Sequence, residues 1–209
     1  MRRKLGAVCM ALGVVLLLGA LGLFLWNENE ADRAEAASAE LMTKLSVTIE
    51  ENVQKQPNSP SYIGTPDELL PPEEKKMTEV EIDGYGYIGY LTIPRLGLEL
   101  PIMADWDYTR LKIAPCRYSG TTMEENLVLV AHNYRKHFGP IRRLVPGDEA
   151  AFVDMDGNVT CYLVAAVDVV PPSSVEEVTS GSFDLALVTC TYGGNTRLVV
   201  YCDVYEPES

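Results

Sequence analysis

The chain has 209 residues, which is enough for one ordinary domain with an additional segment and too short for two large domains. Hydrophobic residues make up 47% and charged residues 22% of the sequence, which argues against both a disordered acidic polymer and a protein that crosses a membrane many times. The formal net charge of −13 makes nucleic acid an unsuitable partner, because an acidic surface repels phosphate backbones.

The first predicted element is a membrane anchor at residues 5–26. These residues carry no charge, and about 20 apolar residues cross the hydrocarbon core of a bilayer as a helix. Three cations at 2–4 precede the stretch and acids follow it, so the N-terminus is expected in the cytoplasm and the rest outside. We therefore expect a single-pass protein of the cell membrane, surrounded there by lipid. A cleaved signal peptide is the alternative, since residues 34–36 (Ala-Glu-Ala) offer an A-x-A-like site.

A stalk and a linker are predicted next. Residues 28–54 are rich in Ala, Glu, Leu and Lys, and we expect them to extend the membrane helix as a solvated stalk or to act as a simple spacer. Five prolines lie between Lys55 and Met77, and each removes a backbone donor and disfavours helix in the residue before it. The chain thus divides into a cytoplasmic tip and anchor at 1–26, a stalk and linker at 27–80, and a folded domain at 81–209.

The folded domain is predicted to be all-β. From about Tyr85, short β-branched and aromatic runs alternate with Gly, Pro, Asn and Asp, which is typical of a barrel or sandwich. We predict strands near 87–93, 98–103, 127–132, 149–154, 160–170, 185–191 and 197–205, and short helices at 107–113 and 138–144. The pair Asp156-Gly157 predicts a hairpin turn between two of these strands.

One interpretation of the cysteines is that one of them is an unpaired, reactive thiol. Cys9 lies in the predicted span, and four others lie outside it: Cys116, Cys161, Cys190 and Cys202. Their spacings are long and irregular, with no CxxC, which supports neither a disulfide scaffold nor a zinc site. We therefore expect no metal and no cofactor.

The most informative stretch runs from Leu185 to Cys202, where two strands flank Gly193-Gly194. If these glycines form a two-residue turn, Cys190 and Arg197 face each other with Cβ atoms about 4.5 to 5.5 Å apart. A fixed cation favours the thiolate, which is the nucleophilic form, and a guanidinium also donates to an oxyanion. The alternative is that Cys190 is a small buried apolar residue, the commonest fate of a free cysteine.

A thiol nucleophile needs a group that transfers protons, and the chain has two histidines. His132 ends the run Asn-Leu-Val-Leu-Val-Ala at 126–131, so we expect it where a buried strand reaches the rim of the domain. His137 falls in the polar segment 133–137, and we expect it to be a solvated loop residue. His132 is therefore the candidate acid and base.

These residues resemble the sortases, the membrane-anchored cysteine transpeptidases of Gram-positive bacteria. The resemblance rests on the strand end 187–190 (Leu-Val-Thr-Cys), Arg197 on the next strand, and the strand end 130–133 (Val-Ala-His-Asn). It extends to the anchor and to Gly89–Pro94, which is similar to the family's first barrel strand. It covers about residues 80–205.

The resemblance implies an eight-stranded β-barrel in which Cys190 attacks the carbonyl after the Thr of a C-terminal signal similar to LPxTG. A thioester forms, His132 moves the protons, and Arg197 stabilises the oxyanion or holds the peptide. Thr189 and Asn133 are then expected at the substrate pocket. The implied partners are secreted proteins that carry the signal, and an amine of a cell-wall precursor or a pilin lysine.

The subclass stays open. The pair His132-Asn133 is similar to one branch of the family, and the Thr-Cys-Thr sequence with its Tyr-Gly turn is similar to the pilin-polymerising branch. The lid motif of many pilus sortases is absent, since the linker has Thr-Pro-Asp at 65–67. Glutamates similar to family calcium ligands stand at 124, 125, 176 and 177, but a solvated acidic face is the interpretation we adopt. Two alternatives to a transpeptidase are a non-catalytic peptide-binding barrel and a thiol hydrolase.

Overall fold

A computed structural model describes residues 2–55 and 76–207. It begins with a long helix, α1 (Arg2–Lys55), and nine strands follow in the second described range. The strands are β1 (Val80–Ile82), β2 (Tyr85–Ile93), β3 (Leu98–Met103), β4 (Cys116–Ser119), β5 (Leu127–Val130), β6 (Glu149–Asp154), β7 (Val159–Val170), β8 (Leu185–Cys190) and β9 (Arg197–Val204). The short helices between them are η1 (Pro94–Leu96), η2 (Arg110–Lys112), η3 (Gly139–Arg143) and α2 (Val175–Thr179). Most of the proline-rich linker, including the tripeptide at 65–67, lies outside the described residues.

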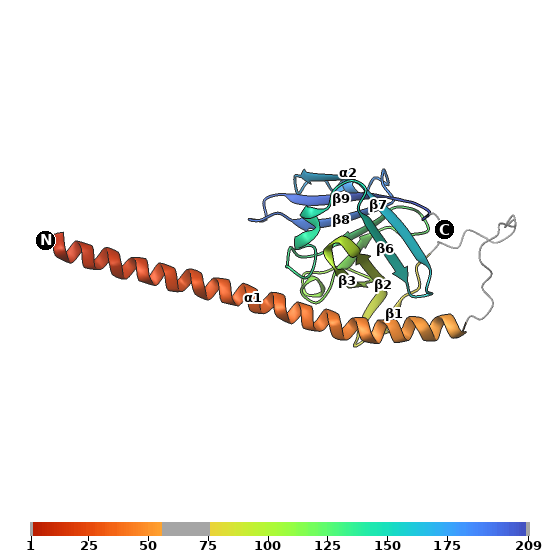
Figure 1. The fold of residues 1–209 in the computed structure, drawn as a ribbon, viewed down its shortest axis with the longest axis horizontal. Coiled ribbons are helices and arrows are strands. Elements are labelled where there is room, and N and C mark those ends of the chain that lie inside the picture. The colour runs from red at the N-terminus through yellow and green to blue at the C-terminus, as the bar shows by residue number, and fades with distance from the viewer. Residues whose placement is uncertain (1, 56–75, 208–209) are drawn as a thin grey trace.

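Eight of the strands close into a barrel (Figure 1). The order around it is β2-β3-β4-β5-β8-β9-β7-β6, and β6 pairs with β2 to complete the ring. The remaining strand, β1, pairs with the first part of β2 and adds no member to the ring. The eight-stranded barrel implied by the family resemblance is confirmed.

The closure of the barrel depends on a change of partner within β2. Residues 85–87 pair with β1, and residues 89–92 pair with β6. Between them the pairing with β3 shifts register, and Gly89 has a φ of +144°. A Cβ atom at this position would overlap the carbonyl oxygen of Val153 on β6. Glycine therefore lets the two backbones meet where the ring closes.

The barrel has two apolar faces because strand side chains alternate in direction. The interior contains Leu129 of β5 and Leu187 of β8, together with other fully buried residues. On the outer face of the same two strands, Val128 and Ala186 belong to a second cluster that includes Val199. This outer cluster forms part of the floor on which the candidate site is built.

The longer strands were predictable and the shortest elements were not. The intervals 98–103 and 149–154 agree with β3 and β6, and the hairpin through Asp156-Gly157 is confirmed by the pairing of β6 with β7. The predicted helices at 107–113 and 138–144 are present as the shorter 3₁₀ segments η2 and η3. The predictions omitted β1, β4 and α2, which have three, four and five residues.

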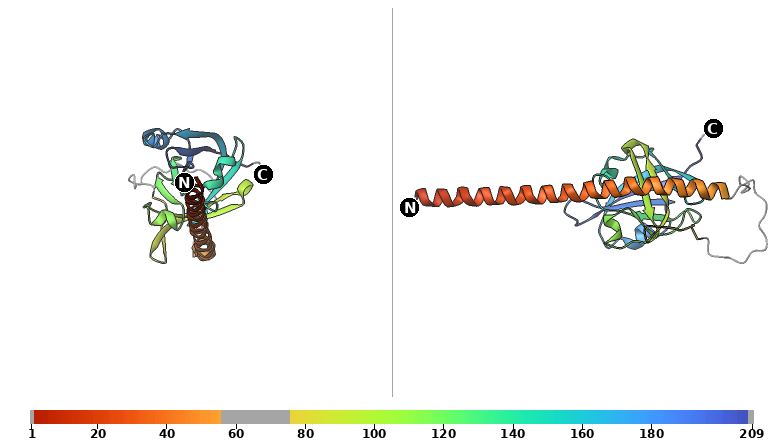
Figure 2. Two further views of the ribbon diagram at one scale, coloured as in Figure 1. Left: turned by 90° about the vertical axis from the view of Figure 1, so that its left-hand side faces the viewer. Right: turned by 90° about the horizontal axis from the view of Figure 1, so that it is seen from below.

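Helix α1 does continue through the predicted stalk, but it is not a solvated stalk over its whole length. Leu41, Leu45 and Ile49 are buried against a barrel cluster that includes Met103 and Cys116. Their spacing of four residues places them on one face of the helix, which lies along the barrel (Figure 2). Lys44 adds an ion pair of 2.6 Å with Asp83. The helix is thus packed onto the barrel.

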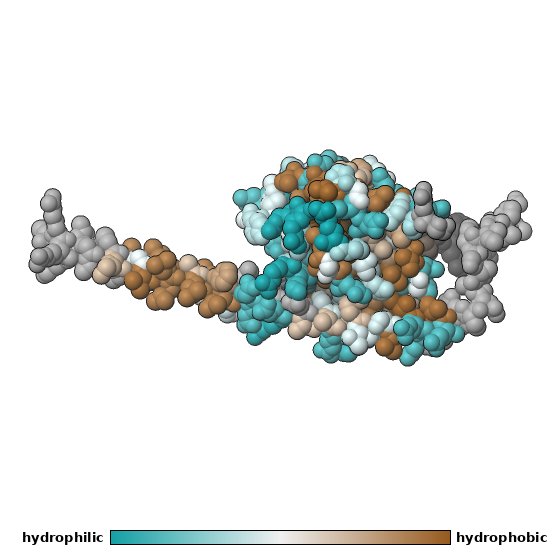
Figure 3. Space-filling model, in the orientation of Figure 1, coloured by the Kyte–Doolittle hydropathy of each residue, from teal (hydrophilic) through white to brown (hydrophobic). Residues whose placement is uncertain are grey.

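The N-terminal half of α1 extends beyond the barrel and carries exposed apolar side chains, shown in brown in Figure 3. Among the residues that the structure describes, no helix meets the length and apolarity needed to cross a membrane. The predicted anchor, 5–26, includes positions 5–9 and 11, whose side chains lie outside the described ones. The anchor stays a prediction.

Candidate active site

The candidate site is a groove of about 380 Å³ on the outside of the barrel. Its apolar lining includes Val128 and Val130 of β5 and Val188 of β8, which come from the sheet. One wall is the segment 170–179, which leads from β7 through α2, and aromatic residues 106, 108 and 118 also line it. His132, Thr189, Cys190 and Arg197 line the same groove.

The parallel pairing of β5 with β8 brings the histidine to the cysteine. Val130 is the register partner of Val188, and the backbone N–H of Ala131 donates to the carbonyl of Val188 at 3.1 Å. Two residues further along each strand stand His132 and Cys190. Since parallel strands end at the same edge of a sheet, the two side chains are delivered to one place from positions 58 residues apart in the sequence.

Thr189 links strand β8 to the end of β5 at this edge of the sheet. Its side chain is buried, and its hydroxyl donates to the carbonyl of Ala131 at 2.9 Å, directly before His132. It therefore ties the end of β8 to the end of β5. Asn133, the other residue expected at the substrate pocket, follows His132 but is not among the residues that line the groove.

Arg197 stands opposite Cys190, as the sequence predicts. The two residues are Cα partners in the antiparallel pair β8–β9. The turn differs from the expected two-residue turn: the N–H of Gly194 donates to the carbonyl of Thr191, and Thr191 bonds to Thr196 through backbone and hydroxyl groups. The connection therefore spans residues 192–195, and the register is unchanged because the longer loop has the same centre.

The guanidinium of Arg197 is held by its own loop. Its Nη1 donates to the carbonyl of Gly194 at 3.0 Å and to the carbonyl of Thr196 at 3.2 Å. Because two carbonyls occupy one nitrogen, the planar group has a defined orientation and keeps further N–H donors for other partners. Such an arrangement suits an oxyanion that develops beside Cys190.

The other described cysteines are poor candidates for a nucleophile. Cys116 and Cys202 are fully buried, and burial raises the pKa of each thiol to about 12. Cys161 is partly exposed on β7 but does not line the groove. All four thiols at 116, 161, 190 and 202 are free. Cys190 is thus the one described thiol that faces the groove.

The two histidines occupy different environments, and the expectation for one of them is wrong. His132 lines the groove, whereas His137 is fully buried rather than solvated. Burial, assisted by the nearby His132, lowers the pKa of His137 to about 4. The ring of Tyr134 is close to both, with its centroid 4.9 Å from that of His132 and 5.5 Å from that of His137. The polar segment 133–137 folds back, so its last residue turns inward.

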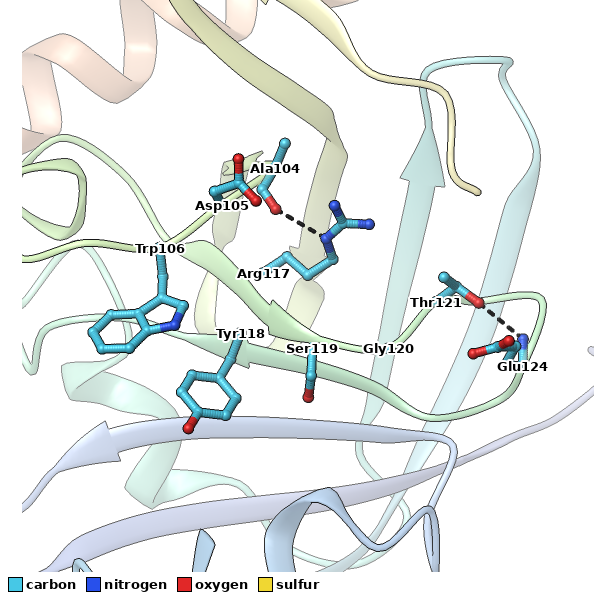
Figure 4. Close-up of a pocket in the computed structure, with 9 residues that line it drawn as sticks. All are labelled: Ala104, Asp105, Trp106, Arg117, Tyr118, Ser119, Gly120, Thr121 and Glu124. Carbon is cyan, nitrogen blue, oxygen red and sulfur yellow. Dashed lines mark hydrogen bonds between the residues drawn. The ribbon is translucent and has the colours of Figure 1, made fainter. Parts of the chain in front are cut away.

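The aromatic wall and a second pocket were not foreseen. Trp106 and Tyr118 line the groove, their ring centroids 5.4 Å apart, and they also line a polar pocket of about 510 Å³ (Figure 4). In that pocket, Nε of Arg117 donates to the carbonyl of Ala104 at 2.9 Å. The alternation of Asp with aromatic residues at 105–108 is the sequence signal that could have indicated an exposed aromatic surface.

The acidic residues similar to family calcium ligands do not form a cluster. Glu124 lies in the loop after β4, and Glu176 and Glu177 lie on α2. Within the described ranges, no three His, Cys, Asp or Glu side chains are arranged to hold a metal ion.

Comparisons with known proteins give one matching family model and a set of similar solved structures. A family model for the sortase domain matches residues 91–205. Sortase C1 of GBS pilus island 1 is 24% identical, with a TM-score of 0.51, over 59% of this chain and 66% of that one. Sortase C1 from Streptococcus suis is 24% identical, with a TM-score of 0.53, over 59% and 75%. Streptococcus agalactiae sortase C1 in complex with MTSET is 25% identical, with a TM-score of 0.52, over 59% and 69%. No curated protein matches the sequence.

Proposed function

Because the chain belongs to the sortase family, we propose that it is a cysteine transpeptidase that cleaves a C-terminal sorting signal similar to LPxTG and transfers the protein to an amine. The observation that carries the proposal is the register of three strands. It places Cys190 beside the strand end of His132 and opposite Arg197, on one groove.

In the first half-reaction, His132 holds the proton of the Cys190 thiol, and the thiolate sulfur forms a bond to the carbonyl carbon after the Thr of the signal. The carbonyl oxygen becomes an oxyanion, and the free N–H donors of Arg197 stabilise it. The C–N bond then breaks, and His132 gives a proton to the departing amine. The protein remains on Cys190 as a thioester.

In the second half-reaction, an acceptor amine attacks the thioester carbon while His132 takes a proton from it. The C–S bond breaks, the sulfur of Cys190 leaves as the thiolate, and a new amide joins the two substrates. The cycle ends with the Cys190 thiolate and the protonated His132 with which it began, so no cofactor is consumed. The acceptor is proposed to be an amine of a cell-wall precursor or a pilin lysine.

The lining of the groove supports an apolar signal peptide. Apart from His132 and Arg197, the side chains that line it are uncharged. Away from these two residues, a charged side chain would lose hydration without gaining a partner, whereas Leu and Pro would bury apolar surface. Thr189 and Asn133 are kept as proposed substrate-site residues.

We further propose a cell-envelope location, with residues 5–26 as an anchor and residues after Trp26 outside. The support is the uncharged stretch and the three cations before it. Protease added to intact protoplasts should release a soluble fragment that contains His132 and Cys190. A fragment that stays protected would contradict this topology.

The test of the activity uses the full chain in detergent and a fluorogenic LPxTG peptide, with and without a lysine-bearing or glycine-bearing amine. Ligation that depends on the amine supports a transpeptidase, cleavage alone identifies a thiol hydrolase, and binding without turnover identifies a peptide-binding barrel. Cys161→Ala is the matched control for Cys190→Ala, because Cys161 is a partly exposed thiol away from the groove. His132→Ala should lower turnover by about 10² to 10⁴.

A further inference from the structure

We propose that Arg142 and Tyr192 form a clamp that positions the guanidinium of Arg197 for the reaction. Arg142 lies on η3 and Tyr192 lies in the loop that joins β8 to β9. Both are positioning residues, and the inference rests on the proposed transpeptidase function of the groove.

The contact between the two residues has two components. Nη1 of Arg142 donates to the hydroxyl of Tyr192 at 2.6 Å, and the guanidinium carbon lies 4.8 Å from the centroid of the Tyr192 ring. A hydrogen bond from a charged donor is stronger than one between neutral groups, and the cation–π contact adds to it. The same Nη1 also donates to the carbonyl of Gly139 at 3.3 Å, which fixes the Arg142 side chain on its own helix.

Bonds between Thr191 and Thr196 close the base of the loop that carries Tyr192, but the tip at residues 192–194 is open to solvent. Gly193 and Gly194 have φ values of +90° and +75°, and no atom lies within 4 Å of a Cβ built on either. Two adjacent glycines in open space leave a backbone with much conformational freedom. Tyr192 is 76% exposed, so little packing holds its side chain. Its hydrogen bond with Arg142 is a restraint from another element, η3.

The position of the loop decides the position of Arg197. Nη1 of Arg197 donates to the carbonyl of Gly194, two residues after Tyr192, and to the carbonyl of Thr196. When the loop moves, the carbonyl of Gly194 moves with it, and the guanidinium loses the acceptor that fixes its orientation. A restraint on Tyr192 is therefore transmitted to Arg197 through two residues of backbone.

The clamp also joins the two halves of the site. The N–H of Phe138, which precedes η3, donates to the carbonyl of His132 at 3.2 Å. Arg142 is four residues further on and reaches the loop that follows Cys190. The segments after the candidate base and after the candidate nucleophile are thus held together at the surface.

A purely structural role predicts that losing the clamp lowers stability and all activities together. A positioning role predicts a loss that disappears when Arg197 can no longer act. These alternatives differ in double-mutant cycles, because residues that act through one group are not additive.

The experiment compares Arg142→Ala, Tyr192→Phe and their combination in the full chain, each also in an Arg197→Lys background. Arg143→Ala is the matched control, because Arg143 is the next residue, is exposed and is not part of the clamp. We expect each single change to lower kcat for the LPxTG peptide about tenfold, which corresponds to losing a charged hydrogen bond at the surface. The combination should cost no more than either change, and Cys190 alkylation should change less than about twofold.

In the Arg197→Lys background, Arg142→Ala should change kcat by less than about twofold. An undiminished tenfold effect there, additive single changes, or clamp variants with the turnover of Arg143→Ala would overturn the inference. Hydrogen–deuterium exchange at residues 191–196 gives a readout that does not need turnover. Faster exchange in Arg142→Ala than in Arg143→Ala supports the clamp, and equal exchange refutes it. Wild type without peptide turnover would refute the proposed function instead.

Discussion

Cys190 and Arg197 are direct cross-strand partners, yet the guanidinium of Arg197 turns to two carbonyls of the loop between them. One of its nitrogens is thereby committed to the protein. The orientation of the planar group is fixed before any substrate arrives.

Arg197→Lys should therefore lower turnover by about 10² to 10³, because a single ammonium cannot hold the loop carbonyls and an oxyanion with the same geometry. The measurement is the steady-state rate on one peptide, beside Arg197→Ala. The pH dependence of Cys190 alkylation serves as the control for charge. A lysine variant with near wild-type turnover would leave only an electrostatic role for Arg197.

The four described cysteines should separate into three groups. Cys190→Ala should abolish turnover and remain folded, while Cys161→Ala should change neither property. Cys116→Ala and Cys202→Ala should keep turnover but lose about 1 kcal/mol of unfolding free energy, because both thiols are fully buried. Peptide turnover and urea denaturation measure the two properties. Loss of turnover in a folded Cys202→Ala would refute the assignment of the nucleophile.

His137 should make the fold sensitive to acid. Its pKa of about 4 in the folded protein lies below the value of 6.5 expected when it is exposed, so the unfolded chain binds more protons between these values. The stability contributed by neutral His137 is complete above about pH 6.5 and is lost as pH falls toward 4, by up to about 3 kcal/mol.

Urea denaturation at pH 7, 5.5 and 4 measures this loss. Replacing the ring by an apolar side chain in His137→Leu should flatten the dependence relative to wild type, whereas His132→Gln should leave it in place. Identical pH profiles for wild type and His137→Leu would show that His137 is not the acid-sensitive group.

Gly89 should be far less tolerant of substitution than Gly97, although both have positive φ values. Gly89→Ala brings a methyl group against the backbone of Val153 and should cost about 3 kcal/mol or more. Gly97→Ala meets no atom within 4 Å and should cost about 1 kcal/mol for the backbone conformation alone. Thermal unfolding of the two variants decides this, and equal losses would mean that ring closure does not depend on the close approach.

Trp106→Ala should raise KM for the signal peptide about tenfold, since it removes an aromatic surface that packs on Tyr118 along the groove. The alkylation rate of Cys190 should not change. The chain's other tryptophan, Trp26, lies in the exposed part of α1, so Trp26→Ala is the control. An unchanged KM in Trp106→Ala would remove the aromatic wall from substrate binding.

The sequence was sufficient where a pattern repeats within one element or across one turn. The hairpin register of Cys190 with Arg197 could be derived because it depends on two strands and the short connection between them. The burial of His137 could not, because it depends on a chain reversal in which the N–H of His137 donates to the carbonyl of Tyr134. The packing of Leu45 was hidden for a similar reason, since a helical stripe shows its partner only when the barrel surface is known.

Helix α1 determines where the end of the barrel that carries the candidate site lies. The ends of β8 and β9 that are joined by the loop point toward the N-terminal half of α1 (Figure 1), and Arg135, three residues after His132, pairs with Glu28 at 2.9 Å. A helix rises about 1.5 Å and turns about 100° per residue. The distance of Cys190 from the apolar end of α1, and its direction around the helix axis, therefore depend on the number of helical residues between that end and the barrel. An insertion of two residues in the part of α1 that extends beyond the barrel would rotate the barrel by about 200° about the helix axis, so the groove would face the opposite side. A flexible linker in place of the helix would not transmit this rotation.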